Sequence, residues 1–419
     1  MAAPDRPTDR AEFRQLLVET GMAMVAAGDA VDLIEESLRR IVAAYGVDGI
    51  RILLLPTSLF VQDGSGTEAR VEFSAAAPTM LRLDQIDALY RVVKDLEKGS
   101  LAPADGLRRL AAVHTLRPTF AWPVRSIGHG VLTAGLMLLL QPTPAGIAAA
   151  FVLGLAVGLL KLWNLPTLTL IFPIAAAFLT GVLVFAATQV VHVDNPIRLL
   201  VAPLVTFLPG AMLAVGTMEL AAGQMVSGAS RLVSGIVQLL LLGFGILAAW
   251  YLVGAPRTEL LDHKVAGLGP WAGWVGVLVF ALGVYLHFSA PLRSLPWILL
   301  VLLVAFGAQT VGAALFGGQI SGFFGAAAMT PVVLWVETTP AGPPKLVTFL
   351  PAFWLLVPGA AGLITLTQIV GPGADVAANA PYDVTVAFIS IALGVLIGTS
   401  LYRTARQGVR RIAGVSPSR

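Results

Sequence analysis

The distribution of apolar positions separates a first part of mixed periodicity from a second part made of long apolar stretches. Up to about residue 45, apolar residues recur at helical spacing in two runs that meet near Gly28, and Asp29 is placed to cap the second helix. The period then becomes that of β-strands, before helical spacing returns. The expected elements are helices at 10–28 and 30–45, strands at 50–55, 58–62 and 69–73, and helices at 84–98 and 103–114. Residues 1–120 are therefore expected to form a small cytosolic α+β domain.

Ten apolar stretches follow Pro118, each close to the length that crosses the hydrocarbon layer of a bilayer. They lie at 124–140, 144–163, 167–190, 197–219, 231–253, 271–288, 294–315, 318–336, 346–370 and 383–402. The pattern predicts a polytopic α-helical membrane protein of ten transmembrane helices. The expected organisation is a five-span half at 121–254, an external linker at 255–270, a second five-span half at 271–402 and a basic cytosolic tail at 403–419.

The string LVTFLP occurs twice, at Leu204–Pro209 and at Leu346–Pro351. Proline removes a hydrogen bond from a helix interior, so Pro209–Gly210 in the first copy, and Pro351 with Pro358–Gly359 in the second, predict interrupted helices. Five spans separate equivalent points of the copies, and an odd number reverses direction across a bilayer. The pattern favours two halves of inverted topology, the plan by which transporters build a site from broken helices. Chance recurrence of a short apolar string is the alternative.

Composition and charge support this interpretation. The 419 residues are 57% apolar and 12% charged, which is typical of an integral membrane protein. Residues 1–120 nevertheless hold 17 of the 24 acidic residues, as a water-soluble domain would. Lys and Arg are far more frequent in the loops predicted to be inside than in those predicted outside, which carry only Arg198, Arg257 and Lys264, so both termini are expected in the cytosol. The start of the chain lacks the apolar core of a signal peptide.

Other classes of site are disfavoured by composition. The chain has no cysteine, which excludes disulfides and thiolate metal sites, and no metal or cofactor is expected. No basic stripe interleaved with aromatic residues indicates nucleic acid binding.

Three segments resemble the bacterial threonine/serine exporter family. PTSLFVQDGSG from Pro56 and the helical run from Leu81 to Leu110 are similar to its amino-terminal domain. The run LVTFLPGAMLAVGTMELAAGQMVSGASRLVSG, from Leu204 to Gly235, is similar to its pattern of a Pro-Gly break, an acid-Leu pair, a Ser-Gly and an Arg-Leu. The resemblance spans nearly the whole chain and is weaker in the second half. It implies a ten-span exporter of L-threonine and L-serine in the bacterial inner (plasma) membrane, driven by the proton-motive force.

The candidate substrate-binding residues lie at the two predicted breaks, where a half-helix end can bind the carboxylate of an amino acid and free carbonyls its ammonium group. They are Thr206, Pro209, Gly210, Thr348, Pro358 and Gly359. For the threonines the alternative is a hydrogen bond to a carbonyl within their own helix.

Ionisable residues within spans are the candidates for proton coupling. Glu219 ends the first broken span and coincides with the acid of the family pattern; its alternative role is an ion pair with Arg231. His129 and His287 lie in other spans, and structural hydrogen bonding is the alternative for each. Ser227, Gly228 and Arg231 complete the family pattern and are expected to have structural or gating roles.

The leading hypothesis is a secondary exporter of threonine and serine, not an enzyme, with protons and the lipid bilayer as partners; a homo-oligomer is left open. A dicarboxylate exporter is the transporter alternative, because a related two-component branch of the family is associated with succinate export. A membrane-anchored hydrolase is less favoured, since Ser58 has no nearby base in the sequence. A structural or signalling module without flux is the last alternative.

Overall fold

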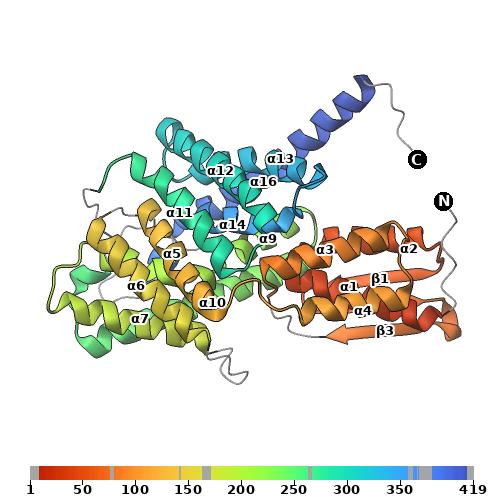
Figure 1. The fold of residues 1–419 in the computed structure, drawn as a ribbon, viewed down its shortest axis with the longest axis horizontal. Helices are drawn as coiled ribbons and strands as arrows, with labels where there is room; N and C mark the ends of the chain where they lie inside the picture. Colours follow the sequence, from red (N-terminus) through yellow and green to blue (C-terminus); the bar gives the residue numbers. More distant parts are fainter. Residues whose placement is uncertain are drawn as a thin grey trace. The chain divides into compact units, whose positions relative to one another are not determined.

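The computed structural model describes residues 9–75, 80–140, 143–162, 171–262, 267–356, 362–365, 367 and 380–412, with the side chains of 380–384 and 408–412 excepted. The chain divides into two compact units (Figure 1). The first comprises Met1–Thr119 together with Val215–Leu232, and the second comprises Phe120–Ala214 together with Val233–Arg419. The short segment 215–232 thus groups with the amino-terminal part of the chain.

The first unit has the α+β composition that the sequence predicts. Its elements are α1 (Arg10–Ala27), α2 (Val31–Ala44), β1 (Ile50–Leu55), β2 (Ser58–Asp63), the 3₁₀ helix η1 (Gly66–Glu68), β3 (Arg70–Ala75), α3 (Leu83–Glu97) and α4 (Pro103–His114). The three strands form an antiparallel sheet in the order β1-β2-β3. The expected helices and strands are confirmed, with boundaries that differ by at most two residues.

One face of the sheet lies against the helices. Leu59 and Val61 of β2 are fully buried, as are Phe13 and Leu17 of α1. Gly21 of α1 permits the close approach, because a Cβ there would collide with the Leu59 side chain. Alternation of buried and half-exposed residues along β2 fits a sheet covered on one side.

The start of α2 differs from the expectation. Its N-cap is Ala30, which provides no side-chain hydrogen bond, so the prediction that Asp29 caps this helix is wrong. The helix begins one residue too late for an Asp29 cap. The Asp29 carboxylate instead accepts hydrogen bonds from the Ala30 N–H, at 3.2 Å, and from the Tyr90 hydroxyl.

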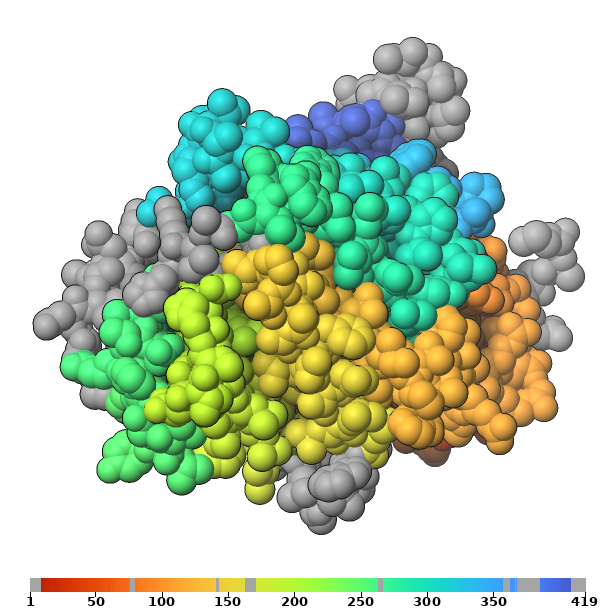
Figure 2. Space-filling view, turned by 60° about the vertical axis from the view of Figure 1, so that its left-hand side comes forward, coloured from red at the N-terminus to blue at the C-terminus, as the bar shows by residue number. Residues whose placement is uncertain are grey.

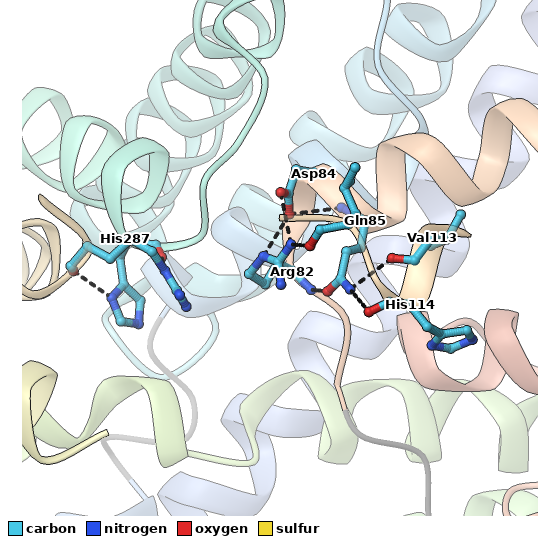
Figure 3. A network of polar contacts seen from close by, with 8 residues as sticks. Arg82, Asp84, Gln85, Val113, His114 and His287 are labelled. Carbon is cyan, nitrogen blue, oxygen red and sulfur yellow. Dashed lines mark hydrogen bonds and ion pairs between the residues drawn. The ribbon is translucent and has the colours of Figure 1, made fainter. Parts of the chain in front are cut away.

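A polar network joins the start of α3 to the end of α4 (Figure 3). The Gln85 side chain donates to the carbonyls of Val113 and His114, at 3.0 and 3.3 Å, and accepts the Arg82 N–H at 3.1 Å. Arg82 in turn contacts Asp84 at 3.0 Å. The carbonyls at the end of α4 are therefore satisfied by a side chain of α3.

The second unit is helical, and each of the ten apolar stretches corresponds to a described helix or helix pair. The elements are α5 (Trp122–Leu140), α6 (Pro144–Leu160), α7 (Phe172–Thr188), α8 (Pro196–Val201), η3 (Ala202–Phe207), α9 (Gly210–Ala221), α10 (Met225–Val253), η4 (Arg257–Leu260), α11 (Trp271–His287), η5 (Leu292–Ser294), α12 (Leu295–Phe316), α13 (Ser321–Thr338), α14 (Lys345–Leu356) and α16 (Ala380–Ile412). Helices α9 and α10 each contribute residues to both units. Helix α16 continues to Ile412, so the first part of the predicted tail is helical.

Four of the described helices are long and apolar enough to cross a membrane: α5, α10, the η5–α12 segment and most of α16. The bent pair formed by α8–η3 and α9 would make a fifth. Helices α6, α7, α11 and α14 are apolar but shorter, at 10–17 residues. Many of the helices also expose large apolar side chains, such as Val152, Leu183, Phe244 and Leu278. The chain is a membrane protein, and the count of ten spans stays a prediction.

Helices α5 and α11 lie side by side in both views (Figures 1 and 2). Glycines make this contact possible: a Cβ at Gly283 of α11 would overlap the backbone of Leu132, and a Cβ at Gly135 of α5 would overlap the backbone of Phe280. Helix α6 approaches the other side of α5 through Gly154 and Gly158, a Gly-x-x-x-Gly pair that permits close packing.

The two copies of LVTFLP have different local structures. In the first, η3 ends at Phe207, Leu208 is extended, and α9 begins at Gly210 with a bend of 64°. In the second, α14 continues through Pro351 without interruption. Pro358 and Gly359 lie outside the described residues. The first break is confirmed, the interruption predicted at Pro351 is wrong, and a break at Pro358–Gly359 stays a prediction.

Candidate functional site

A polar cluster lies beside the first break, inside the second unit. It consists of His129 from α5, Lys161 at the end of α6, Thr206 from η3 and His287 at the end of α11. His129 is fully buried and His287 nearly so. The centroids of the two imidazole rings are 4.6 Å apart. Residues separated by up to 158 positions in the chain thus meet at one point of an apolar unit.

Lys161 is at the centre of this cluster. Its Nζ donates to the Thr206 Oγ1 at 2.5 Å and lies 3.4 Å from the His287 Nε2. It also lies over the ring of Phe207, 4.7 Å from the centroid, where a cation–π contact is favourable. The partners that the structure describes for the ammonium group are therefore all neutral.

The hydrogen-bond partners assign the proton on each imidazole. The Nδ1 of His129 is 2.8 Å from the Gly154 carbonyl, and the Nδ1 of His287 is 3.0 Å from the Arg125 carbonyl. Because a carbonyl oxygen only accepts, both Nδ1 atoms carry a proton and donate. Each Nε2 is then the accepting atom of a neutral ring: that of His129 faces the Thr206 hydroxyl at 3.2 Å, and that of His287 faces Lys161. All four side chains satisfy one another in this arrangement.

Backbone contacts hold the two histidines in place. The Arg125 Nε donates to the His287 carbonyl at 3.3 Å, so the start of α5 and the end of α11 are joined by two reciprocal bonds. Gly128 allows this approach, since a Cβ there would lie 2.7 Å from the His287 backbone nitrogen. Gly158 of α6 faces the His129 Cβ in the same way. The small residues on α5 and α6 are the reason that large polar side chains fit here.

The cluster contains no acid among the side chains that the structure describes. No described carboxylate lies within 4 Å of the Lys161 Nζ. Asp194 faces His192, Asp262 binds Arg198 at 2.6 Å, and Glu337 accepts the Lys345 N–H at 3.2 Å. The acids whose side chains are not described are Asp5, Asp375 and Asp383. A cation without a carboxylate partner is costly in an apolar environment. A cation at such a place is therefore a candidate for a functional role.

Glu219 belongs to the first unit, whereas the residues of this cluster belong to the second. Its carboxylate is 1% exposed, accepts the Val31 N–H at 3.0 Å and lies 3.1 Å from the Arg231 Nε. Arg231 also donates to the Asp29 carbonyl at 2.8 Å. Together Glu219 and Arg231 bind the backbone where α1 passes into α2, at the Val31 N–H and the Asp29 carbonyl. The carboxylate thereby satisfies an N–H at the start of α2, the position for which Asp29 was expected.

Ser227 and Gly228 lie in the same unit, in the tight pair that α9 and α10 form. Ser227 is buried, and a Cβ at Gly228 would lie 2.6 Å from the Gly216 carbonyl oxygen. This geometry gives Gly228 a packing role.

The two copies of LVTFLP use their threonines differently. Thr206 faces Lys161 and His129, whereas the Thr348 hydroxyl donates to the Lys345 carbonyl within its own helix, at 3.0 Å. Pro209 and Gly210 form the bend, and the Pro209 carbonyl accepts the Leu213 N–H at 2.9 Å. The site is therefore asymmetric between the copies.

Sequence reasoning missed Lys161 and Phe207. Lys161 lies near the end of the apolar stretch 144–163, where its charge indicates only that this end faces the cytosol. The available signal was that its helix carries glycines at 154 and 158, which allow α6 to lie against α5 and bring its end to the break.

Comparison with known proteins assigns the chain to a family. The model of one family, described as "Putative threonine/serine exporter", matches residues 15–253. No curated protein and no solved structure matches the chain. The matched region includes the α+β domain, the break, Lys161 and the Glu219–Arg231 pair, and it covers more than half of the 419 residues. On this evidence the chain belongs to the threonine/serine exporter family.

Proposed function

We propose that this protein is a secondary active exporter that moves L-threonine and L-serine out of the cytosol in exchange for entering protons. The observation that carries the proposal is the polar cluster at the interrupted helix, which lies inside an apolar unit of an exporter family member. Binding at a broken helix is the usual solution in transporters, because the interruption frees backbone groups for a polar substrate.

The substrate-binding residues in this proposal are Thr206, Pro209 and Gly210. Thr206 offers its hydroxyl beside a cation, and the chain at Leu208 is extended, so its peptide groups leave the helical pattern. Thr348, Pro358 and Gly359 are proposed to act from the second half. The Thr348 hydroxyl would have to leave the Lys345 carbonyl in order to do so.

Proton coupling is proposed for His129 and His287. Each ring is neutral, and its Nε2 faces a group that substrate binding would disturb, Thr206 in one case and Lys161 in the other. A proton arriving at the His287 Nε2 would break its hydrogen bond with Lys161, since both groups would then only donate. A proton arriving at the His129 Nε2 would reverse its bond with the Thr206 hydroxyl, which can also accept. Glu219 stays a second candidate, although its carboxylate already binds Val31 and Arg231.

Two features support the five-plus-five plan with inverted halves. The third and fifth helices of each half pack closely through glycine: Gly245 of α10 meets the Ile174 carbonyl of α7, and Gly394 of α16 meets the Phe323 carbonyl of α13. In addition, polar contacts join residues that are predicted to lie near the same side of the membrane. Arg198 joins Asp262 and the Leu140 carbonyl, which are all predicted near the outside, and Arg125, Lys161 and His287 are all predicted near the cytosol.

Transport into and out of proteoliposomes tests the function. Vesicles preloaded with labelled threonine or serine should release it, in a protein-dependent way, when a proton gradient is imposed in the direction opposite to efflux. Release that is unchanged when the gradient is removed would contradict the coupling, and the absence of release of both amino acids would contradict the function.

Dicarboxylate export is the second candidate. The observation that favours it is the position of Arg125, a second cation whose guanidinium donates to the His287 carbonyl at the edge of the cluster. It predicts that the same vesicles release succinate in preference to threonine.

A further inference from the structure

The Lys161 ammonium group is bound in a way that leaves its charge uncompensated. Its described partners are a hydroxyl, a neutral imidazole and an aromatic ring. A charge removed from water is stabilised mainly by an opposite charge, and polar partners replace that only in part. The described side chains of the second unit place no carboxylate at hydrogen-bond distance from it, and the carboxylate of a bound substrate would supply the opposite charge.

We propose that Lys161 is the residue that recognises the carboxylate of the transported molecule. This inference rests on the proposed function and specifies the chemistry of its site. A carboxylate that approaches Lys161 would pair an opposite charge with the ammonium group, which its present hydroxyl and imidazole partners do not supply. The Thr206 hydroxyl and the His287 Nε2 are the partners that the substrate would replace.

The position of Lys161 fits this role. Lys161 contacts Thr206 and Phe207, the residues that end η3 immediately before the bend at Leu208–Pro209. Lys161 is neither fully buried nor fully exposed, and it caps the end of α6 beside the bend. Replacement of the Thr206 contact would free that hydroxyl to bind the substrate as well.

The preference of the site for a carboxylate also follows from these contacts. An empty site keeps Lys161 on neutral partners, and the substrate carboxylate then supplies the missing charge. A related alcohol without the carboxylate would have to compete with Thr206 and His287 for the same ammonium protons and would gain nothing in exchange. Selection for a carboxylate is therefore built into the cluster, whichever amino acid or dicarboxylate carries it.

Binding to the purified full-length protein tests this by comparing L-threonine with L-threoninol, in which a hydroxymethyl group replaces the carboxylate. The native chain should bind threonine more tightly by about 10- to 100-fold, the range expected for one hydrogen bond to a charged group. Lys161→Met should lose this preference, and Lys161→Arg should recover part of it. Lys94→Met is the matched control, because Lys94 is exposed on α3 of the first unit. A folded Lys161→Met that keeps the native preference would overturn the proposal.

A second measurement uses only the native chain, in case Lys161→Met does not fold. Threonine should protect Lys161 from an amine-reactive ester, as read by peptide mass spectrometry, and threoninol should not. Equal protection by both compounds would overturn the proposal.

A succinate arm separates this inference from the proposed function. Binding of succinate and not of threonine, lost in Lys161→Met, would overturn the amino-acid substrate and support carboxylate recognition. Transport of threonine without any binding preference over threoninol would support the amino-acid substrate and overturn carboxylate recognition by Lys161.

Discussion

Glu219 shows how one side chain can serve either the fold or the transport cycle. Its buried carboxylate lies between the Val31 N–H and Arg231, and Arg231 extends the contact to the Asp29 carbonyl. We expect Glu219→Gln and Arg231→Gln each to lower the thermal stability of the purified protein. The cost of leaving one partner of a buried pair alone is about 3–5 kcal/mol.

The double variant separates the two roles of Glu219. If the pair is structural, the double variant should be less destabilised than the sum of the single variants. A well-folded Glu219→Gln that binds and exchanges threonine but no longer responds to the proton gradient would instead assign coupling to Glu219. Transport at the native rate with normal gradient dependence would exclude coupling and direct attention to His129 and His287.

Tyr45 provides a pH-dependent contribution to the first unit. It is 2% exposed, and its hydroxyl donates to the Leu101 carbonyl at 2.6 Å. Burial raises its pKa to about 12, whereas an unfolded tyrosine ionises near pH 10. The folded state therefore holds this proton more tightly than the unfolded state does. The free energy of unfolding falls as the pH rises above the unfolded pKa, and the loss approaches about 3 kcal/mol once the pH has passed the folded pKa.

Phenolate absorbance of the full chain during alkaline titration checks this. The difference between the native chain and Tyr45→Phe should titrate about two units above a free tyrosine. A Tyr45 phenol that ionises with the exposed tyrosines would contradict the buried hydrogen bond.

At the scale of elements, glycine positions determine which helices can meet. Gly283 of α11 lies directly against the Leu132 backbone. We expect Gly283→Ala to separate α5 from α11 and to lower the thermal stability by about 1–3 kcal/mol, because backbone atoms cannot move aside as a side chain does. His129 and His287 lie on these two helices, so threonine binding should weaken as well.

Gly318 is the matched control in the same unit. It has open space around its Cα and no positive φ, so Gly318→Ala should leave the melting temperature and binding unchanged. Equal effects of the two substitutions would contradict the packing argument.

The elements of the first unit could be predicted closely because each has a local signal. The change of period at Ile50 and Pro103 at the first turn of α4 are examples. The break at Pro209 was also predictable, since proline acts on its own helix. The cluster was not, because Lys161, Thr206 and His287 lie on three helices and nothing local in the sequence shows which apolar stretches are neighbours. A local signal can also mislead, as at Pro351, where the helix continues. A helix tolerates proline when neighbouring helices hold it in place.

At the scale of the whole molecule, the inverted plan assigns opposite sides of the membrane to equivalent loops. His192 follows α7 and Thr338 ends α13, and both are exposed. These are equivalent positions, after the third helix of each half, and the plan places the first outside and the second inside. The chain has no cysteine, so single substitutions carry no background in a labelling experiment.

Labelling with a membrane-impermeant maleimide therefore tests the topology directly. His192→Cys should react in intact cells, and Thr338→Cys should react only after permeabilisation. Lys94→Cys on α3 should behave like Thr338→Cys, because the charge asymmetry of the loops places the first unit in the cytosol. Reaction of His192→Cys and Thr338→Cys from the same side would exclude inverted halves. In that case the recurrence of LVTFLP, and the different structures of Thr206 and Thr348, would be properties of unrelated helices. If they react from opposite sides, the halves are inverted, and Thr206 and Thr348 are equivalent residues that have taken different roles, the first at Lys161 and the second within its own helix.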